Sequence, residues 1–506
     1  MKSRIRRTAE KAGYEERQKK PDNERKDKTY RRKSRNTERG KEGRIMFHLK
    51  ERNTTVRIEF IAGLTTFMAM AYILMVNASM FTDIVGAPVS YGAMYVSTAI
   101  ASVIGSVLIG LLAGLPLAQA PGMGLNAFFV YTVCDTMGFS YANTLVIVLF
   151  DGVLFVLLTL TGLRRIIFSS IPKAVKAAIS AGIGLFIGFL GMQNTGLIVN
   201  SESTLVDLHS FDILFGKTTW TEVMPILITL IAVILIGVMS RKKVKGAVFC
   251  GIMAATVLYY ALAFISIPGF KVNFSFEVIQ PFRDFFSQCF MKVFTEGFDF
   301  SAYIEANGMN SFIIALLTSA LAMCMVDMFD TLGTLYGACT VGGILDENGD
   351  IPNMEKAMLA DAVGTCCGAV CGTSTVTSFV EASAGVAEGG RTGLSAIFTA
   401  MFFFISMFFA PLSALIPSCA TAAALIYVGI LMMGSAMSVD WNNPEEAVPA
   451  FLTVSIMPFG YNISYGIAFG LISHILMKVL LGKVKEVKIG TWVIGLLFLL
   501  MFCVSR

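Results

Sequence analysis

Long apolar runs alternate with short polar segments over most of the chain. Runs such as 91–113, 222–239 and 394–415 have the length of a bilayer crossing, which takes about 20 residues. Reading every run in this way predicts an all-α polytopic membrane protein with fourteen transmembrane helices in two sets of seven. The first set is 57–80, 91–113, 119–134, 141–161, 173–193, 222–239 and 246–266. The second set is 310–340, 357–371, 375–388, 394–415, 419–437, 445–459 and 462–481.

The cations between these runs indicate the orientation of the chain. Connections that carry them are 162–176, 240–246, 389–393 and 482–488, and all four lie on one side of the membrane if the N-terminus is cytoplasmic. Cytoplasmic loops carry an excess of Lys and Arg, so we predict a cytoplasmic N-terminus. A last apolar stretch, 490–504, is too short to assign as a further span.

The two sets of helices show traces of an internal repeat. The segment IPKAVKAAISAGIGLF begins at Ile171 and resembles IPSCATAAALIYVGIL, which begins 245 residues later at Ile416. APGMGLNAFF begins at Ala120, and GTSTVTSFVE begins 252 residues later at Gly372. Two halves of seven spans each have opposite orientations, as in many transporters. We therefore predict inverted repeats at 46–266 and 310–481, an extracellular connection at 267–309 and a C-terminal segment at 482–506.

The third and tenth spans, 119–134 and 375–388, are short, and each follows a cluster of Gly, Pro, Ser or Thr that would delay or break its helix. Short, interrupted spans at corresponding positions of two halves indicate a transporter's binding site. Their free backbone groups have to face a cavity or a ligand at membrane depth. We predict a polar pocket where these two broken spans meet.

Composition supports the membrane assignment and limits the other functions. Hydrophobic residues make up 55% of the 506 residues and charged ones only 15%. Of the 40 lysines and arginines, 20 lie within residues 1–52, so we expect residues 1–45 to form a disordered, basic cytoplasmic tail that obeys the positive-inside rule. A tail that binds anionic lipid or nucleic acid is the less favoured reading. The cysteines lie almost entirely in or beside apolar spans, and we expect no disulfide and no metal.

Carboxylates inside the predicted spans include Asp327 and Asp330 on the eighth, Asp361 on the ninth and Glu381 on the tenth. A charge at the bilayer centre costs roughly 2.5–3.5 kcal/mol, so repeated acids predict a substrate and proton pathway. Asp327 and Asp330 share a helix face, and two close carboxylates favour binding of a proton. A structural hydrogen bond to the backbone where helices cross is the alternative for any single acid.

Other polar and aromatic side chains cluster near these acids. Thr375 and Ser378 lie in the GTSTVTSF segment with Phe379, while Gly124 and Asn126 lie in APGMGLNAFF. A cavity with carboxylates, amides and aromatic faces suits a flat, neutral heterocycle with ring N–H donors, because a carboxylate accepts such donors from a base edge. Packing against lipid or neighbouring helices is an equally good explanation for the aromatic rings.

Several motifs resemble those of one transporter family. AGLTTFMAMAYILMVNASM (62–80), APGMGLNAFF (120–129), VDMFDTLGTL (326–335), ADAVGT (360–365) and GTSTVTSFVEASAGVAEGGRTGL (372–394) are similar to the azaguanine-permease-like branch of the nucleobase:cation symporter-2 family. The resemblance covers residues 46–505. It implies the uracil-permease fold with a core and a gate domain, and proton-coupled import of hypoxanthine, guanine or adenine across the cell membrane. It also suggests a homodimer, with the proton as coupling ion and no cofactor.

The resemblance assigns roles to individual positions. In the family, an acid on the eighth span and one on the tenth bind the base; Glu381 matches the tenth, while Asp327 and Asp330 both remain eligible for the eighth. Asn126 matches a third-span asparagine near the pocket, and Asp361 matches an acidic position on the ninth span. Substrate contacts are therefore expected from Asp327, Asp330, Glu381, Asn126, Phe379, Ser378, Thr375 and Gly124. Proton coupling is expected from Asp327, Asp330, Asp361 and Glu381.

The predicted mechanism is alternating access, in which helices near 171–193 and 416–437 help to form the gate. A transporter of uracil or xanthine, or an anion transporter of the same fold, is the alternative, although acids at mid-membrane would repel an anion. An intramembrane aspartyl protease needs two aspartates on facing helices, whereas Asp327 and Asp330 share one helix. We therefore predict a transporter and not an enzyme.

Overall fold

The structure is a computed structural model that describes residues 47, 49–84, 89–161, 171–201, 204–213, 216–272, 276–342, 344 and 351–504. The chain divides into two compact units, residues 1–56 and 57–506. The described helices and strands belong to the second unit, except for Val56, the first residue of α2. The predicted basic tail, 1–45, lies outside the described residues.

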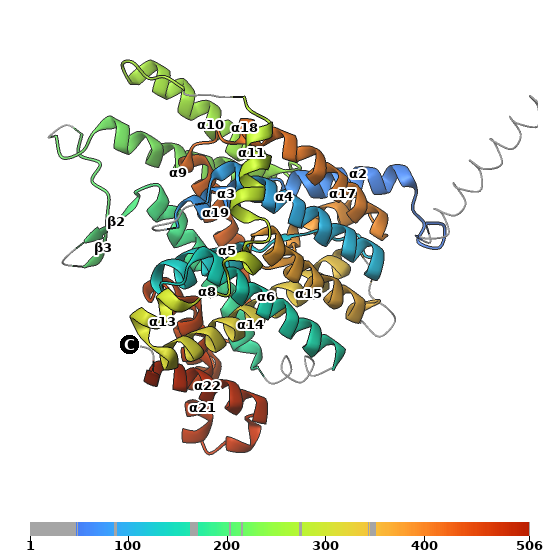
Figure 1. The fold of residues 1–506 in the computed structure, drawn as a ribbon, viewed down its shortest axis with the longest axis vertical. Helices are drawn as coiled ribbons and strands as arrows, with labels where there is room; N and C mark the ends of the chain where they lie inside the picture. Colours follow the sequence, from blue (N-terminus) through green and yellow to red (C-terminus); the bar gives the residue numbers. More distant parts are fainter. Residues whose placement is uncertain are drawn as a thin grey trace, which may run out of the picture. The chain divides into compact units, whose positions relative to one another are not determined.

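The first half of the second unit contains seven predicted spans in the expected order (Figure 1). Ser90 and Ser140 start their helices as N-caps, each accepting a hydrogen bond from the backbone three residues later, as is usual for serine at this position. The elements are α2 (Val56–Met70), α3 (Tyr72–Thr82), α4 (Tyr91–Leu108), η1 (Ile109–Ala113), β1 (Gln119–Pro121), α5 (Met123–Ala127), η2 (Phe128–Thr136), α6 (Tyr141–Leu160), α8 (Lys173–Asn194), β2 (Ile198–Ser201), β3 (Leu205–Leu208), α9 (Trp220–Arg241) and α10 (Ala247–Ser266).

The connection at 267–309 is itself helical in part, with α11 (Ile279–Asp284), η3 (Phe285–Cys289), α12 (Lys292–Thr295) and α13 (Ser301–Asn307). The second half follows with α14 (Met309–Gly342), α15 (Met354–Cys371), β4 (Val376–Ser378), η4 (Val380–Ala382), α16 (Ser383–Ala387), α17 (Gly393–Ser406), η5 (Met407–Phe409), α18 (Ala410–Ser413), α19 (Ser418–Met433), η6 (Gly434–Ser438), α20 (Pro444–Phe459), α21 (Ile463–Leu480), η7 (Val484–Glu486) and α22 (Ile489–Val504). The last apolar stretch is therefore a helix, and it packs against α14 and α21.

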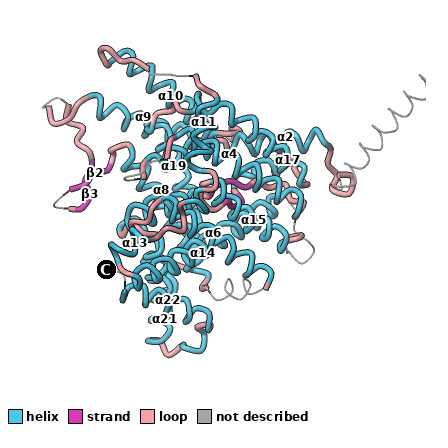
Figure 2. The backbone as a smooth tube through the Cα atoms, in the orientation of Figure 1, coloured by secondary structure: helices cyan, strands magenta, loops and turns pink. Residues whose placement is uncertain are grey.

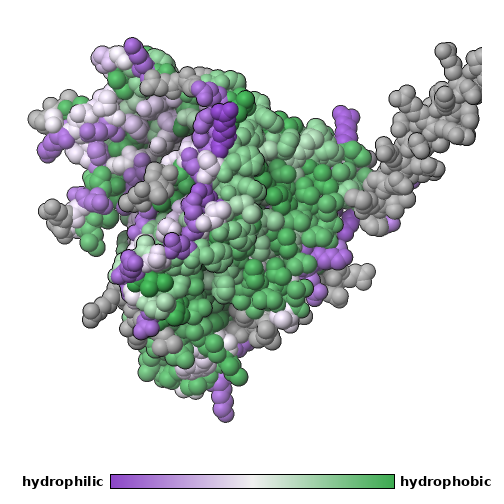
Figure 3. All heavy atoms as spheres, in the orientation of Figure 1, coloured by the Kyte–Doolittle hydropathy of each residue, from purple (hydrophilic) through white to green (hydrophobic). Residues whose placement is uncertain are grey.

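Ten helices in the described part of the chain are long and apolar enough to cross a membrane. The other four predicted spans are the two broken ones, α20 with 16 residues, and α15, which carries Glu355, Lys356 and Asp361. Figure 3 shows a broad hydrophobic area on one face of the molecule, with hydrophilic side chains at its margins and in a band across the upper left of the view. Such a surface is typical of helices that face lipid.

The helices pack in two groups. The core group is α3, α4, α6, α14, α15 and α17, and the gate group is α8, α9, α10, α19, α20 and α21. Within the gate group α8 packs closely on α19, since a side-chain carbon added at Gly184 would lie 2.8 Å from the carbonyl oxygen of Gly429. The segments beginning at Ile171 and Ile416, which the repeat predicted to be equivalent, therefore lie side by side.

Both predicted broken spans begin with extended backbone, which the sequence analysis did not predict. Residues 119–121 and 376–378 form strands β1 and β4, and the helical parts begin only at Met123 and Val380. Figure 2 shows this strand pair among the helices, whereas the hairpin of β2 and β3 lies apart from them. Pro121 has no N–H for a helical bond, and the Thr and Val residues of β4 favour extended backbone.

Candidate functional site

The two broken spans meet through their strands. β1 and β4 run antiparallel, with Gln119 opposite Ser378, Ala120 opposite Thr377 and Pro121 opposite Val376. Two further backbone bonds extend the pairing: Gly122 N donates to Thr375 O at 3.0 Å, and Phe379 N donates to Ala118 O at 3.1 Å. Strand pairing satisfies backbone groups that would otherwise be unbonded inside the membrane. After its strand, each broken span continues as a short helix.

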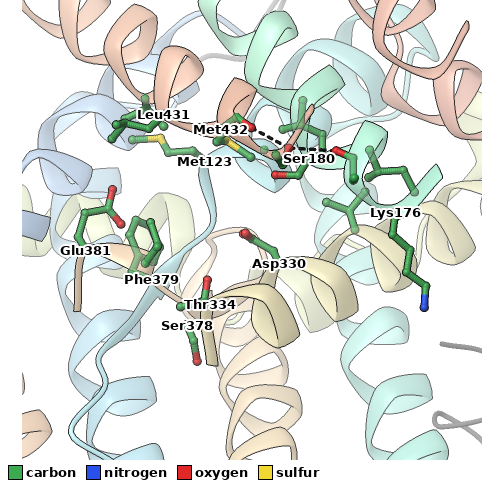
Figure 4. A pocket seen from close by; sticks show the side chains of 18 of the residues that line it. Met123, Lys176, Ser180, Asp330, Thr334, Ser378, Phe379, Glu381, Leu431 and Met432 are labelled. Atoms are coloured by element: carbon green, nitrogen blue, oxygen red, sulfur yellow. Dashed lines mark hydrogen bonds between the residues drawn. The ribbon is translucent and has the colours of Figure 1, made fainter. Parts of the chain in front are cut away.

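A cavity of about 880 Å³ lies beside the strand pair. Its core-group wall is formed by Tyr72 of α3, the start of α5, three residues of α14 and the segment 378–383. Its gate-group wall is formed by α8, α19 and η6. Figure 4 shows the side chains of Glu381, Phe379 and Asp330 on one side of this space and those of Leu431 and Met432 opposite. The cavity therefore lies between the two helix groups.

Two carboxylates, Asp330 and Glu381, face this cavity, and both side chains are half-buried. Glu381 lies on the 3-10 turn that follows β4, and its Oε1 accepts a hydrogen bond of 2.6 Å from the Tyr72 hydroxyl. Asp330 lies beside bare backbone, because a side-chain carbon added at Gly122 would be 3.7 Å from its Oδ2 and only 2.7 Å from Thr377 Cγ2. The glycine thus leaves room around the carboxylate.

The other two predicted acids lie outside the cavity lining. Asp327, one helix turn before Asp330, is fully buried, and its Oδ2 accepts a hydrogen bond of 3.5 Å from Thr365. Asp361 is also fully buried, and it accepts bonds from Gln119 Nε2 at 3.0 Å and from Thr331 Oγ1 at 2.7 Å. Asp361 therefore joins α15 to β1 and α14 behind the cavity wall.

The predicted polar residues divide in the same way. Ser378, Phe379 and Gly124 line the cavity. Asn126 is buried and accepts a hydrogen bond from Ser374, while its Nδ2 donates to Pro121 O at 3.4 Å, so its amide holds the two broken spans together. Thr375 is buried as well and contributes its carbonyl to the strand pairing.

Sequence reasoning missed several residues that line the cavity: Tyr72, Lys173, Lys176, Ser180 and Thr334. The lysines had been explained as cytoplasmic loop charges, but α8 begins at Lys173, and the i, i+3 spacing places both on one helix face. The signal for Tyr72 was a hydroxyl inside an apolar span, since a buried tyrosine usually has a hydrogen-bond partner.

A model of the Permease family matches residues 57–469. The guanine/hypoxanthine permease PbuO of Bacillus subtilis is 39% identical over 468 residues, covering 90% of this chain and 98% of PbuO. The adenine permease AdeQ of Escherichia coli is 36% identical over 461 residues, covering 90% of this chain and 95% of AdeQ.

A solved structure supports the fold. The transmembrane domain of the cyanobacterium bicarbonate transporter BicA aligns with a TM-score of 0.55 at 16% identity, covering 83% of this chain and 96% of that one. The family match confirms the resemblance drawn from the motifs. The chain therefore belongs to the Permease family, in the branch that contains these purine permeases, and is a multi-pass membrane transporter and not an enzyme.

Proposed function

We propose that this protein imports purine nucleobases in symport with protons by alternating access. The observation that carries the proposal is the cavity between the two helix groups, into which Asp330 and Glu381 both point beside the ring of Phe379 (Figure 4). Hypoxanthine and guanine are the first candidates and adenine the third. Relatives that are 36–39% identical are permeases for adenine or for guanine and hypoxanthine.

The chemistry of the cavity suits a purine. Its volume of about 880 Å³ is within the usual range for small-molecule sites, roughly 300–1,000 Å³. Carboxylates accept hydrogen bonds from ring N–H groups, and Asp330 and Glu381 offer acceptors from two elements, α14 and η4. Phe379, Met123 and Val428 provide apolar surface for a flat ring.

Two acids in one cavity also provide for proton coupling. Asp330 and Glu381 repel each other when both are charged, and this repulsion is strong in a medium of low dielectric constant. Binding of one proton by either acid removes this repulsion. One proton crossing about 150 mV releases roughly 3.5 kcal/mol, which supports a few-hundredfold accumulation of substrate at about 1.4 kcal/mol per decade. We propose that Asp361 and Asp327 support this pair from behind the wall.

Alternating access follows from the position of the cavity between the groups. A side-chain carbon added at Gly124 would lie 2.6 Å from Cγ2 of Ile183, so α5, which packs against the core helices α3 and α14, also touches the gate helix α8 closely. Lys173 and Ser438, which line the cavity, belong to ends of α8 and η6 that the charge pattern assigns to the cytoplasm. We propose that this conformation is open toward the cytoplasm.

An anion is the second candidate substrate, because Lys173 and Lys176 line the cavity and BicA is a bicarbonate transporter. Asp330 and Glu381 argue against it, since an anion between two carboxylates would be repelled. Uracil and xanthine fit the same acceptors as a purine does and remain alternatives within the proposal.

Uptake of labelled hypoxanthine, guanine and adenine in cells without purine carriers tests the proposal, with uracil, xanthine and bicarbonate beside them. Each substrate is measured with and without a protonophore, in wild type, Glu381→Gln and the control Glu305→Gln, which changes an exposed glutamate on α13. We expect purine uptake that the protonophore and Glu381→Gln abolish and that Glu305→Gln preserves. Background uptake of every base by protein present in the membrane would refute the proposal.

A further inference from the structure

Tyr72 is fully buried at the start of α3, and its hydroxyl reaches Glu381, which lies 309 residues later in the chain. Ala71, just before the tyrosine, keeps helical angles and donates its N–H to Phe67 O at 2.7 Å, so Tyr72 lies within the continuous first span Val56–Thr82. The donor–acceptor distance of 2.6 Å is that of a short O–H···O bond to a carboxylate. Both residues line the cavity.

The two cavity acids differ in how their backbone is supported. Asp330 lies within the 34-residue helix α14, which fixes its backbone by regular hydrogen bonds. Glu381 lies on a three-residue 3-10 turn between a three-residue strand and a five-residue helix. A binding group on a short element needs a neighbouring side chain to hold its orientation, and the Tyr72 hydroxyl provides that contact.

We propose that Tyr72 is a positioning residue of the transport site: its hydroxyl holds one carboxylate oxygen of Glu381 and so keeps the other oriented for the substrate. This inference rests on the proposed function, because it assigns Glu381 to base binding. The alternative is a structural bond that serves only to give the buried Tyr72 hydroxyl a partner. In that case Tyr72→Phe removes the hydroxyl that needs the partner, and the affinity for the base stays as in wild type.

A first measurement separates these two roles by uptake kinetics. The matched control is Tyr95→Phe, because Tyr95 is also a buried tyrosine of the core group, but its hydroxyl donates to Ser406 O at 3.2 Å and it lies outside the cavity lining. We expect Tyr72→Phe to raise KM for the base about tenfold while Vmax stays within about twofold of wild type. Tyr95→Phe should leave both unchanged. Equal KM values in the two variants would overturn the proposal.

A second measurement does not depend on the substrate. An apolar carbodiimide reacts with the protonated form of a carboxyl group in membranes, and mass spectrometry gives the rate of labelling at Glu381. We expect faster labelling in Tyr72→Phe than in Tyr95→Phe, because the carboxyl group is released from its donor. Equal rates would overturn the positioning role even if uptake were normal. Absence of base uptake in wild type would refute the proposed function, and labelling would still decide whether Tyr72 holds Glu381.

Discussion

Exchanging each of two aspartates on one helix for asparagine tests the site assignment most directly. Asp327 and Asp330 are one turn apart on α14, so Asp327→Asn and Asp330→Asn are matched in residue type, element and size. Asp330 faces the cavity, whereas Asp327 is fully buried behind it. Sequence motifs alone leave both eligible to bind the base. The structure predicts that only one of the two substitutions affects substrate affinity strongly.

The expected magnitude follows from the contacts. A hydrogen bond to a charged group contributes roughly 1.5–3 kcal/mol, and about 1.4 kcal/mol corresponds to tenfold in affinity. Asparagine keeps one acceptor oxygen but loses the charge, so Asp330→Asn should raise KM by about tenfold or more. Asp327 accepts a long bond of 3.5 Å from Thr365, which an amide oxygen can also accept, and it lies outside the cavity lining. Asp327→Asn should therefore change KM by less than about threefold.

Initial rates of purine uptake over a range of concentrations, with protein amounts measured in the same membranes, give both values. The protonophore provides a second comparison, because Asp330→Asn removes one of two mutually repelling charges and should make residual uptake less dependent on the proton gradient. Asp327→Asn should keep the wild-type response. The reverse result, with Asp327→Asn impaired and Asp330→Asn close to wild type, would refute the geometric assignment.

Three further substitutions test the elements around the cavity. Thr331→Val removes a donor to the buried Asp361 and should lower the free energy of unfolding by about 1–3 kcal/mol, measured by thermal unfolding in detergent, whereas Thr331→Ser should stay near wild type. Gly124→Ala should lower Vmax because the added carbon would lie 2.6 Å from Ile183. The double variant Gly124→Ala with Ile183→Ala should recover the wild-type Vmax, and a Vmax that stays low would argue against this contact. Glu388→Gln breaks a partly exposed ion pair of 2.8 Å and should move the unfolding temperature by no more than about 2 °C, so a larger shift would contradict a surface role.

Hydrophobic patterning predicted the long helices well, because a span of about 20 apolar residues has few other uses. The helices that begin at Tyr91, Tyr141 and Trp220 agree with prediction to within two residues. Patterning did not predict the strands at 119–121 and 376–378, because each forms by pairing with a strand more than 250 residues away in the chain. Gly122 and the Thr-rich segment indicated a break, but only the pairing of β1 with β4 gives the break its form.

The acids show the same limit at the level of single residues. The cost of a charge in the membrane identified Asp327, Asp330, Asp361 and Glu381 together. This cost depends on how deep a residue lies in the membrane and not on the direction in which its side chain points. Direction depends on the neighbours of each side chain: Asp361 accepts hydrogen bonds from Gln119 and Thr331, whereas Asp330 lines the cavity near Gly122. These contacts come from other elements and are set by tertiary packing, so helix spacing alone could not separate the four residues.

The two halves contribute unequally to the cavity, and this inequality bears on its ligand. Among the described residues that line it, both carboxylates, Asp330 and Glu381, come from the second half, while Lys173 and Lys176 come from the first. Two identical inverted halves would form a site with twofold symmetry. A purine has no such symmetry, so a site that binds it in one orientation has to differ between its halves. Carboxylates on the second half and lysines on the first provide this difference.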